Sequence, residues 1–347
     1  MPTRRLVVSF ALATAAACSG DVTGPTGALR FRVEFLSPTE IVPGERIVAR
    51  VEVRNPTAIS VAFRECAPVI ILVRDGAPNL PLGGLACLHG RRDSEIPAGG
   101  SLVDTVSWSG RDLQFTDAGD SLIDLRSGRY RIRPALLVGA RVEAGGEWLD
   151  VRIRPWTRVR LVNTAGDDGP VDLVIGGRLV ARGVAAGAVS PPVVVAAGAQ
   201  SAEVLRSGSP TALAAATVEL AEDSPRVFAI RRAGGARELW EIPDGAPAAA
   251  AGQTYVRVIH LAESAAAVEL RALPPGGAAP VVVSPFTYGA ISSYLVGATG
   301  AWRVVVVNSA QDTLLATAPL PLAGGSTRDV FLVDSPTGRV WATLVER

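Results

Sequence analysis

Two histidines are the only imidazoles in this 347-residue chain, so they are the first residues to consider for acid, base or metal chemistry. His89 lies two residues after Cys87 in a predicted loop, and a Cys–His pair could supply a thiolate nucleophile. A disulfide between Cys87 and Cys66 would abolish that nucleophile. His260 lies in another predicted domain, where we expect a polar residue at the end of a strand. Every basic residue is Arg, which excludes a lysine base or a lysine Schiff base. We therefore expect no catalytic residue and no cofactor.

Acidic loop residues are the remaining candidates for a metal site. Asp117, Asp120 and Asp124 lie close together, and Asp167 and Asp168 are adjacent. Carboxylate oxygens suit Ca²⁺, but the spacing does not fit an EF-hand loop. We expect solvated acids here and no bound metal.

Alternating arginines offer a different chemistry, the binding of anionic polysaccharide. Arg129, Arg131 and Arg133 would lie on one face of a strand, since side chains alternate along it. The alternative interpretation is a solvated face whose arginines pair with neighbouring acids. A row of exposed aromatic residues for carbohydrate is not favoured, because aromatics make up 5% of the chain.

The N-terminus has the pattern of an export signal. Arg4 and Arg5 precede an uncharged apolar stretch of 12 residues, which is too short to cross a bilayer as a helix. Small residues then lead directly into Cys18. This arrangement resembles the lipobox of bacterial lipoproteins. The resemblance implies a signal peptide at 1–17 and a lipidated Cys18 followed by a tether at 18–27. An ordinary secretory signal is the alternative.

Export, if correct, sets the expected location and redox state. The lipid on Cys18 would hold the protein in the bacterial cell envelope, on the outer membrane at its periplasmic or surface face. Cys66 and Cys87 would then form a disulfide, since disulfides persist outside the cytoplasm; two unpaired core thiols are the alternative. Removing 1–17 changes the formal charge from +1 to −1. A near-neutral protein gives no electrostatic reason to bind nucleic acid.

Residues 28–155 are predicted to form the first domain, an all-β unit. Residues 29–35 and 47–54 alternate apolar and charged side chains, which is typical of strands with one buried face. Roughly seven short strands separated by turns predict an immunoglobulin-like β-sandwich. Residues 42–45 and 54–57 resemble bacterial immunoglobulin-like surface modules. Residues 96–100 resemble the BsuPI-type proteinase inhibitor domain.

The rest of the chain contains an internal sequence duplication. Residues 159–163 (Val-Arg-Leu-Val-Asn) correspond to 256–260 (Val-Arg-Val-Ile-His) at an offset of 97. Residues 187–190 (Gly-Ala-Val-Ser) correspond to 289–292 (Gly-Ala-Ile-Ser), and Trp240 falls opposite Trp341. Matching order over such a length predicts two copies of one fold.

These copies predict two tandem β-sandwich repeats at 156–245 and 253–347, joined by an Ala/Pro/Gly linker at 246–252. In the second copy Val256 and Val258 would point inward and Arg257 toward water. The phrase at 171–181 resembles a family of bacterial surface repeats known as a domain of unknown function, DUF4397. That resemblance implies a β-sandwich on exported proteins and no established catalytic residues.

We therefore expect a string of separate β-sandwich bodies with a non-enzymatic role. The leading hypothesis is a lipid-anchored structural or adhesive scaffold, with an envelope protein or polysaccharide as partner. The alternative is a ligand-binding or proteinase-inhibitor-like module acting through the first domain. The loop from Cys66 to Cys87 would distinguish the two hypotheses by projecting from the sheet or packing on it.

Overall fold

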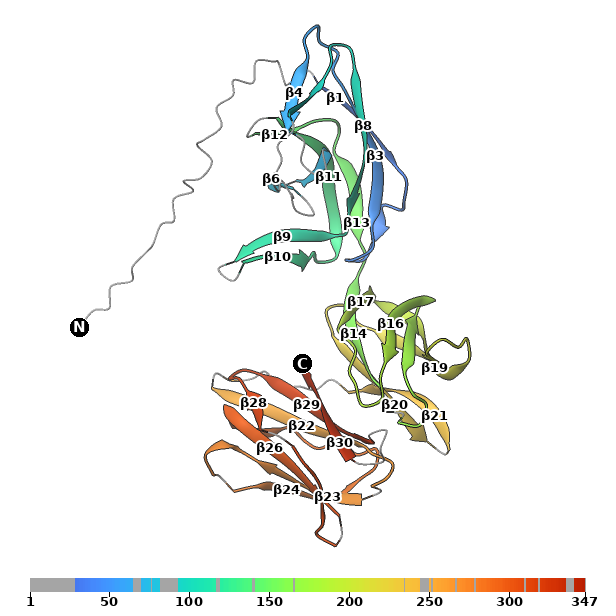
Figure 1. Ribbon diagram of the computed structural model, residues 1–347, viewed down its shortest axis with the longest axis vertical. Helices are drawn as coiled ribbons and strands as arrows, with labels where there is room; N and C mark the ends of the chain where they lie inside the picture. Colours follow the sequence, from blue (N-terminus) through green and yellow to red (C-terminus); the bar gives the residue numbers. More distant parts are fainter. Residues whose placement is uncertain are drawn as a thin grey trace, which may run out of the picture. The chain divides into compact units, whose positions relative to one another are not determined.

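The described part of the chain is built from β-strands, which confirms the predicted all-β class (Figure 1). The computed structural model describes residues 29–346, apart from residues 65–69, 76, 82–92, 117–118, 139–140, 165, 234, 244–249, 251, 266, 278, 309, 318 and 335–339. The chain divides into two compact units, one ending at Pro155 and the other beginning at Trp156. None of the helices in the described ranges has the length and apolar character needed to cross a membrane.

The first unit contains two main sheets and two small ones. One main sheet has the order β1 (Arg30–Phe35), β3 (Ile47–Arg54), β8 (Ser101–Trp108). The other has the order β2 (Glu40–Ile41), β13 (Leu149–Ile153), β11 (Gly128–Val138), β5 (Ile70–Arg74), β6 (Ala77–Pro81), with β12 (Arg141–Ala144) paired to β11. Two antiparallel pairs complete it: β9 (Arg111–Thr116) with β10 (Gly119–Asp124), and β4 (Val61–Arg64) with β7 (Asp93–Ile96).

Both main sheets of the first unit contribute to its core, as in a β-sandwich. Strand β3 buries Val51 and Val53 completely, while Arg50 before them and Arg54 after them are exposed. Ile132 of β11 is equally buried from the other sheet. The alternating pattern in the sequence therefore produces the expected two-faced strands.

The second unit consists of two copies in tandem, and each copy contains two sheets. The first copy contains β14 (Trp156–Val162), β15 (Val171–Ile175), β16 (Arg178–Val184), β17 (Val193–Ala196), β18 (Gly198–Arg206), β19 (Ala212–Leu220), β20 (Arg226–Ala233) and β21 (Ala236–Ile242). The second contains β22 (Gln253–Leu261), β23 (Ala267–Leu273), η2 (Pro275–Gly277), β24 (Val281–Thr287), β25 (Leu295–Ala298), β26 (Gly300–Val307), β27 (Thr313–Ala316), β28 (Leu320–Leu322), β29 (Thr327–Asp334) and β30 (Val340–Glu346).

Strand order is the same in both copies. The first has sheets β17-β14-β20-β21 and β16-β15-β18-β19; the second has β25-β22-β29-β30 and β24-β23-β26-β27, with the extra strand β28 beside β26. In each copy the first strand pairs in parallel with the seventh of its eight common strands, β14 with β20 and β22 with β29. One apolar core fills each copy and draws on both of its sheets. The internal duplication therefore extends from sequence to topology.

The repeated Gly-Ala-Val/Ile-Ser phrase has a structural role that is the same in both copies. Gly187 and Gly289 adopt positive φ angles of 74° and 79°, which favour glycine. Ser190 Oγ accepts a hydrogen bond from the Leu161 N–H at 2.9 Å, and Ser292 Oγ accepts one from the Val258 N–H at 2.9 Å. These hydroxyls satisfy backbone donors that would otherwise be buried without a partner.

Trp240 and Trp341 do not occupy equivalent positions, contrary to the sequence comparison. Trp240 pairs with Ala229 across β20 and β21, whereas Trp341 pairs with Val333 across β29 and β30. The parallel pairing makes Ala229 equivalent to Phe331, since their partners on β14 and β22 are equivalent. The two tryptophans are thus displaced along their strands by two residues.

Candidate functional site

The most distinctive site in the second unit is the junction between its two copies. A shared apolar cluster, here called the junction core, joins the sheet β17-β14-β20-β21 of one copy to the equivalent sheet β25-β22-β29-β30 of the other. Its buried members are Val162, Val227, Ala229, Ile242, Ile259, Leu261, Phe331 and Val333. The predicted string of separate bodies is therefore wrong for the two repeats, which bury equivalent faces against each other.

The strands that form this junction carry a sequence signal that alternation alone does not reveal. Residues 227–230 of β20 and 330–333 of β29 are unbroken apolar runs, and each run is fully or almost fully buried. One side chain points into the copy's own core and the next into the junction core. Continuous apolar strands of this kind are typical of sheets covered on both faces.

Arg257 was expected to face water, and the structure buries it beside the junction instead. Its guanidinium forms two hydrogen bonds with Asp329 of the adjacent strand, Nε to Oδ1 at 3.0 Å and Nη2 to Oδ2 at 2.8 Å. Its third nitrogen donates to the carbonyl of Pro243 at the end of the first copy, at 2.9 Å. The ring of Tyr294 lies 4.7 Å from the guanidinium carbon. A buried arginine is tolerated because this bidentate partner satisfies it.

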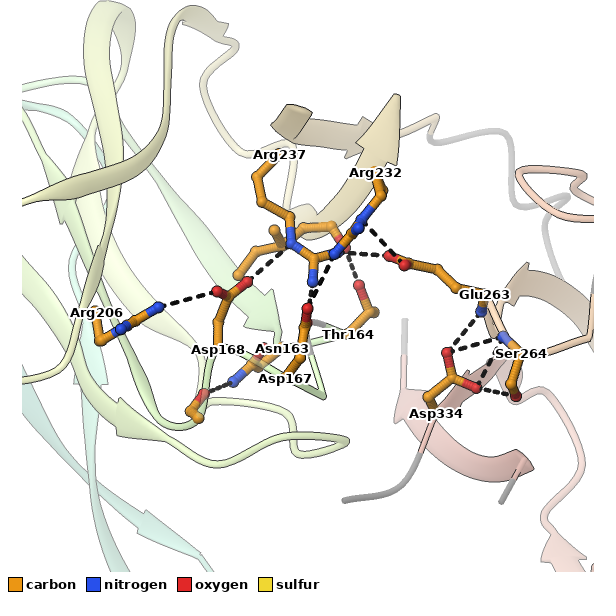
Figure 2. A network of polar contacts seen from close by, with 12 residues as sticks. Asn163, Thr164, Asp167, Asp168, Arg206, Arg232, Arg237, Glu263, Ser264 and Asp334 are labelled. Carbon is orange, nitrogen blue, oxygen red and sulfur yellow. Dashed lines mark hydrogen bonds and ion pairs between the residues drawn. The ribbon is translucent and has the colours of Figure 1, made fainter. Parts of the chain in front are cut away.

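An ion-pair network borders the junction core (Figure 2). Arg237 of β21 binds Asp167 and Asp168 of its own copy and Glu263 of the other copy. Arg232 of β20 likewise pairs with both Asp167 and Glu263, the latter at 3.1 Å. Glu263 therefore receives two arginines from the neighbouring copy, so the network links the copies electrostatically.

This network stabilises the charged form of Arg237. Burial opposes its charged form, but the hydrogen bonds and charges of Glu263, Asp168 and Asp167 outweigh burial and hold the pKa of the guanidinium above its usual value. Asp167 and Asp168 lie in the loop after β14, and Glu263 and Ser264 lie in the equivalent loop after β22. In this second loop the backbone N–H groups of Glu263 and Ser264 donate hydrogen bonds to Asp334, the former at 2.6 Å. Both copies thus attach this loop to their seventh common strand by polar contacts.

Glu263→Gln is expected to lower the free energy of unfolding only modestly, by about 1 kcal/mol or less, because partly exposed ion pairs are screened by solvent. The Glu263 side chain is 30% exposed. Urea unfolding at low and high salt measures the effect, which should shrink as salt rises. Glu269→Gln is the matched control, since Glu269 pairs with Arg271 inside the second copy. A loss above about 3 kcal/mol would contradict this view of a screened contact.

The structure brings only some of the predicted site residues into view. Cys18, Cys66, Cys87, His89 and Asp117 lie outside the described residues, as does most of the predicted linker at 246–252. The lipidation, the disulfide and the loop that would distinguish the two functional hypotheses therefore stay predictions.

Three of the predicted acids, Asp124, Asp167 and Asp168, form ion pairs within the chain. Asp124 pairs with Arg111 at 2.8 Å, and Asp167 and Asp168 belong to the junction network. Asp168 is the more enclosed of that pair, with its side chain 14% exposed. Across the described ranges no three His, Cys, Asp or Glu residues are grouped so as to hold a metal ion.

The arginine-rich face of the first unit combines ion pairs with aromatic stacking. Arg131 pairs with Asp75, and Arg152 with Glu40 at 3.7 Å. Arg133 lies over the Trp148 ring at 4.3 Å. Acidic and aromatic neighbours thus engage much of this face within the chain itself.

Comparison with known proteins identifies one family for part of the chain. Residues 157–271 match the family described as Domain of unknown function (DUF4397). The match begins in β14 and ends within β23, so it covers the first copy together with β22 and part of β23 of the second copy. The expected resemblance to DUF4397 is confirmed for these residues. Among curated proteins, no match is found.

Solved structures show only faint likeness to the chain. A β-glucosidase from Listeria innocua matches with 15% identity over 36% of this chain and 16% of its own length, at a TM-score of 0.22. A candidate adhesin from Bacteroides ovatus matches with 10% identity over 84% of this chain and 86% of its own, at a TM-score of 0.19. The pilus backbone protein RrgB from Streptococcus pneumoniae matches with 7% identity over 81% of this chain and 67% of its own, at a TM-score of 0.15. Likeness at these TM-scores carries no argument about fold or function.

Proposed function

We propose that this protein is a non-enzymatic, lipid-anchored scaffold of the bacterial cell envelope, with a structural or adhesive role. The observation that carries the proposal is the junction, where the first copy, which lies in the DUF4397 match, and the second copy bury equivalent sheet faces against each other. Its titratable groups serve cohesion: Arg237, Glu263 and Asp168 neutralise one another, and Arg257 neutralises Asp329. A pair of sandwiches that share an apolar core suits a spacer or a display platform for an envelope protein or polysaccharide partner.

The first unit fits this role as an immunoglobulin-like sandwich. Its sheets β1-β3-β8 and β2-β13-β11-β5-β6, with β2 parallel to β13, have an order compatible with that fold. Tyr130 lies near the start of β11, and its hydroxyl donates to the Arg126 carbonyl four residues upstream at 2.8 Å. This hydrogen bond is similar to the tyrosine corner of many immunoglobulin-like domains and supports the proposal. Modules of this kind offer loops and sheet edges to partners.

Mass spectrometry of the mature N-terminus, isolated from membranes of cells that express the full chain, tests the anchor. We expect an acylated Cys18 as the first residue, and loss of membrane association in Cys18→Ser with retention in the control Ser19→Ala. A free N-terminus at another residue would overturn anchoring. Assays of the purified protein against peptidase and glycosidase substrates test the non-enzymatic part, and reproducible turnover would overturn it.

A further inference from the structure

His260 is a fully buried imidazole beside the junction core. It lies on β22 between Ile259 and Leu261, which both belong to that core. Its ring stacks on Phe286 with centroids 5.8 Å apart and meets the Tyr288 ring edge-on at 6.3 Å. Nδ1 accepts a hydrogen bond from the Ala262 N–H at 3.3 Å, whereas Nε2 is buried with no hydrogen-bond partner among the described residues.

Tyr288 connects this imidazole to the other copy. Its hydroxyl accepts a hydrogen bond from the backbone N–H of Arg232, on β20 of the first copy, at 2.8 Å. Its ring also packs against the junction core. A displacement of His260 would therefore act on a side chain that spans the two copies.

We propose that His260 and Tyr288 form an acid-sensitive latch between the two repeats. Protonation gives the ring a charge that its pocket of Phe286 and Tyr288 does not solvate. The imidazolium leaves the pocket for water, Tyr288 shifts with it, and the hydrogen bond to Arg232 breaks. The junction core between the copies then loosens.

Burial outweighs the surrounding charges and decides the sign of the pH dependence. Burial lowers the pKa of His260 below its ordinary value of 6.5; the nearby Ala265 backbone and the Asp334 carboxylate favour the charged ring, but less strongly. Burial also raises the pKa of Tyr288, whose other charged neighbours are Glu263, Arg237 and Arg231. Histidine is the group that ordinarily changes charge between about pH 5 and 8. Because the folded-state pKa is depressed, cohesion is complete above pH 6.5 and declines as the pH falls below it.

The first copy shows what this position does without an imidazole. Asn163 is the equivalent residue, and its amide donates to the carbonyls of Gly169 at 2.9 Å and Val184 at 2.8 Å. An amide does not titrate in this range. His260→Asn therefore places the first copy's own residue in the second copy and removes the proposed sensor.

Amide hydrogen exchange of the full chain, compared at pH 7.5 and 5.5 after correction for intrinsic rates, tests the latch. In the wild type, exchange in β20 and β22 should accelerate by up to about tenfold for each pH unit below 6.5, the change expected for one linked proton. His260→Asn should show no such response. An equal response in His260→Asn overturns the proposal, and so does acceleration confined to the second copy with β20 unchanged.

Tyr288→Phe separates the latch from simple destabilisation of the second copy. Without the hydroxyl, β20 should exchange faster at pH 7.5 and lose its pH response, while β22 keeps its own. An unchanged response of β20 in Tyr288→Phe overturns the coupling. If His260→Asn does not fold, the ring of His260 is titrated by NMR in the wild type. A ring that titrates below pH 6.5 in the folded protein supports the latch, and a ring that titrates at or above pH 6.5 overturns it.

Discussion

Phe331→Ala is expected to lower the free energy of unfolding of the second unit by about 3–5 kcal/mol, the usual cost of truncating a buried phenylalanine. Phe331 is completely buried in the junction core. The cavity would lie between the copies, because the equivalent position in the first copy is Ala229, whose methyl group cannot fill it. Urea unfolding measures the loss, and amide exchange in β20 locates it at the junction.

Trp302→Ala is the matched control for this prediction. Trp302 is also buried, but it belongs to the internal core of the second copy. We expect a comparable loss of stability from the control, with less effect on the first copy's β20. If Phe331→Ala costs less than about 1 kcal/mol and leaves exchange in β20 unchanged, the two copies do not share a core in solution.

Asp329→Val is the second substitution with a large expected effect. It introduces the residue of the first copy, since Val227 occupies the equivalent position on β20. The guanidinium of Arg257, whose side chain is 5% exposed, would then remain buried without its carboxylate. Removing one member of a buried ion pair costs about 3–5 kcal/mol, because the other charge is left uncompensated. Thermal or urea unfolding checks the value.

The double variant Arg257→Leu with Asp329→Val tests the cause of that loss. Replacing a whole buried pair by apolar residues is often neutral, so the double variant should recover most of the stability lost in Asp329→Val. No recovery would mean that the loss comes from poor packing of valine and not from the unpaired arginine.

The sequence predicted strands with one exposed face correctly, but it did not predict which polar residues are buried. Alternation located β3 and β11 correctly, because a strand with one wet face must alternate. The same rule placed Arg257 in water, because a polar residue between two inward-pointing valines looks exposed when no partner is known. The partner, Asp329, lies 72 residues later on a strand that pairs in parallel with β22. Such a distant contact leaves no local pattern.

The junction itself could have been anticipated only in part. The apolar runs at 227–230 and 330–333 indicate strands covered on both faces, but they do not say what covers the second face. Glu263 gives no signal at all, since an acid after a strand is ordinarily solvated. His260 was expected to be a polar residue at a strand end, and it is a buried ring in an aromatic pocket.

The amino-acid sequence by itself determined the all-β class and the duplication, since both depend on local side-chain periodicity and on order along the chain. The tertiary structure alone decided that the two copies share a core, that Arg257 and His260 are buried, and that Glu263 bridges the copies. These features depend on which surfaces meet in three dimensions. Burial of an apolar face is favourable wherever it finds a complementary surface, and residues far apart in the chain supply that surface here.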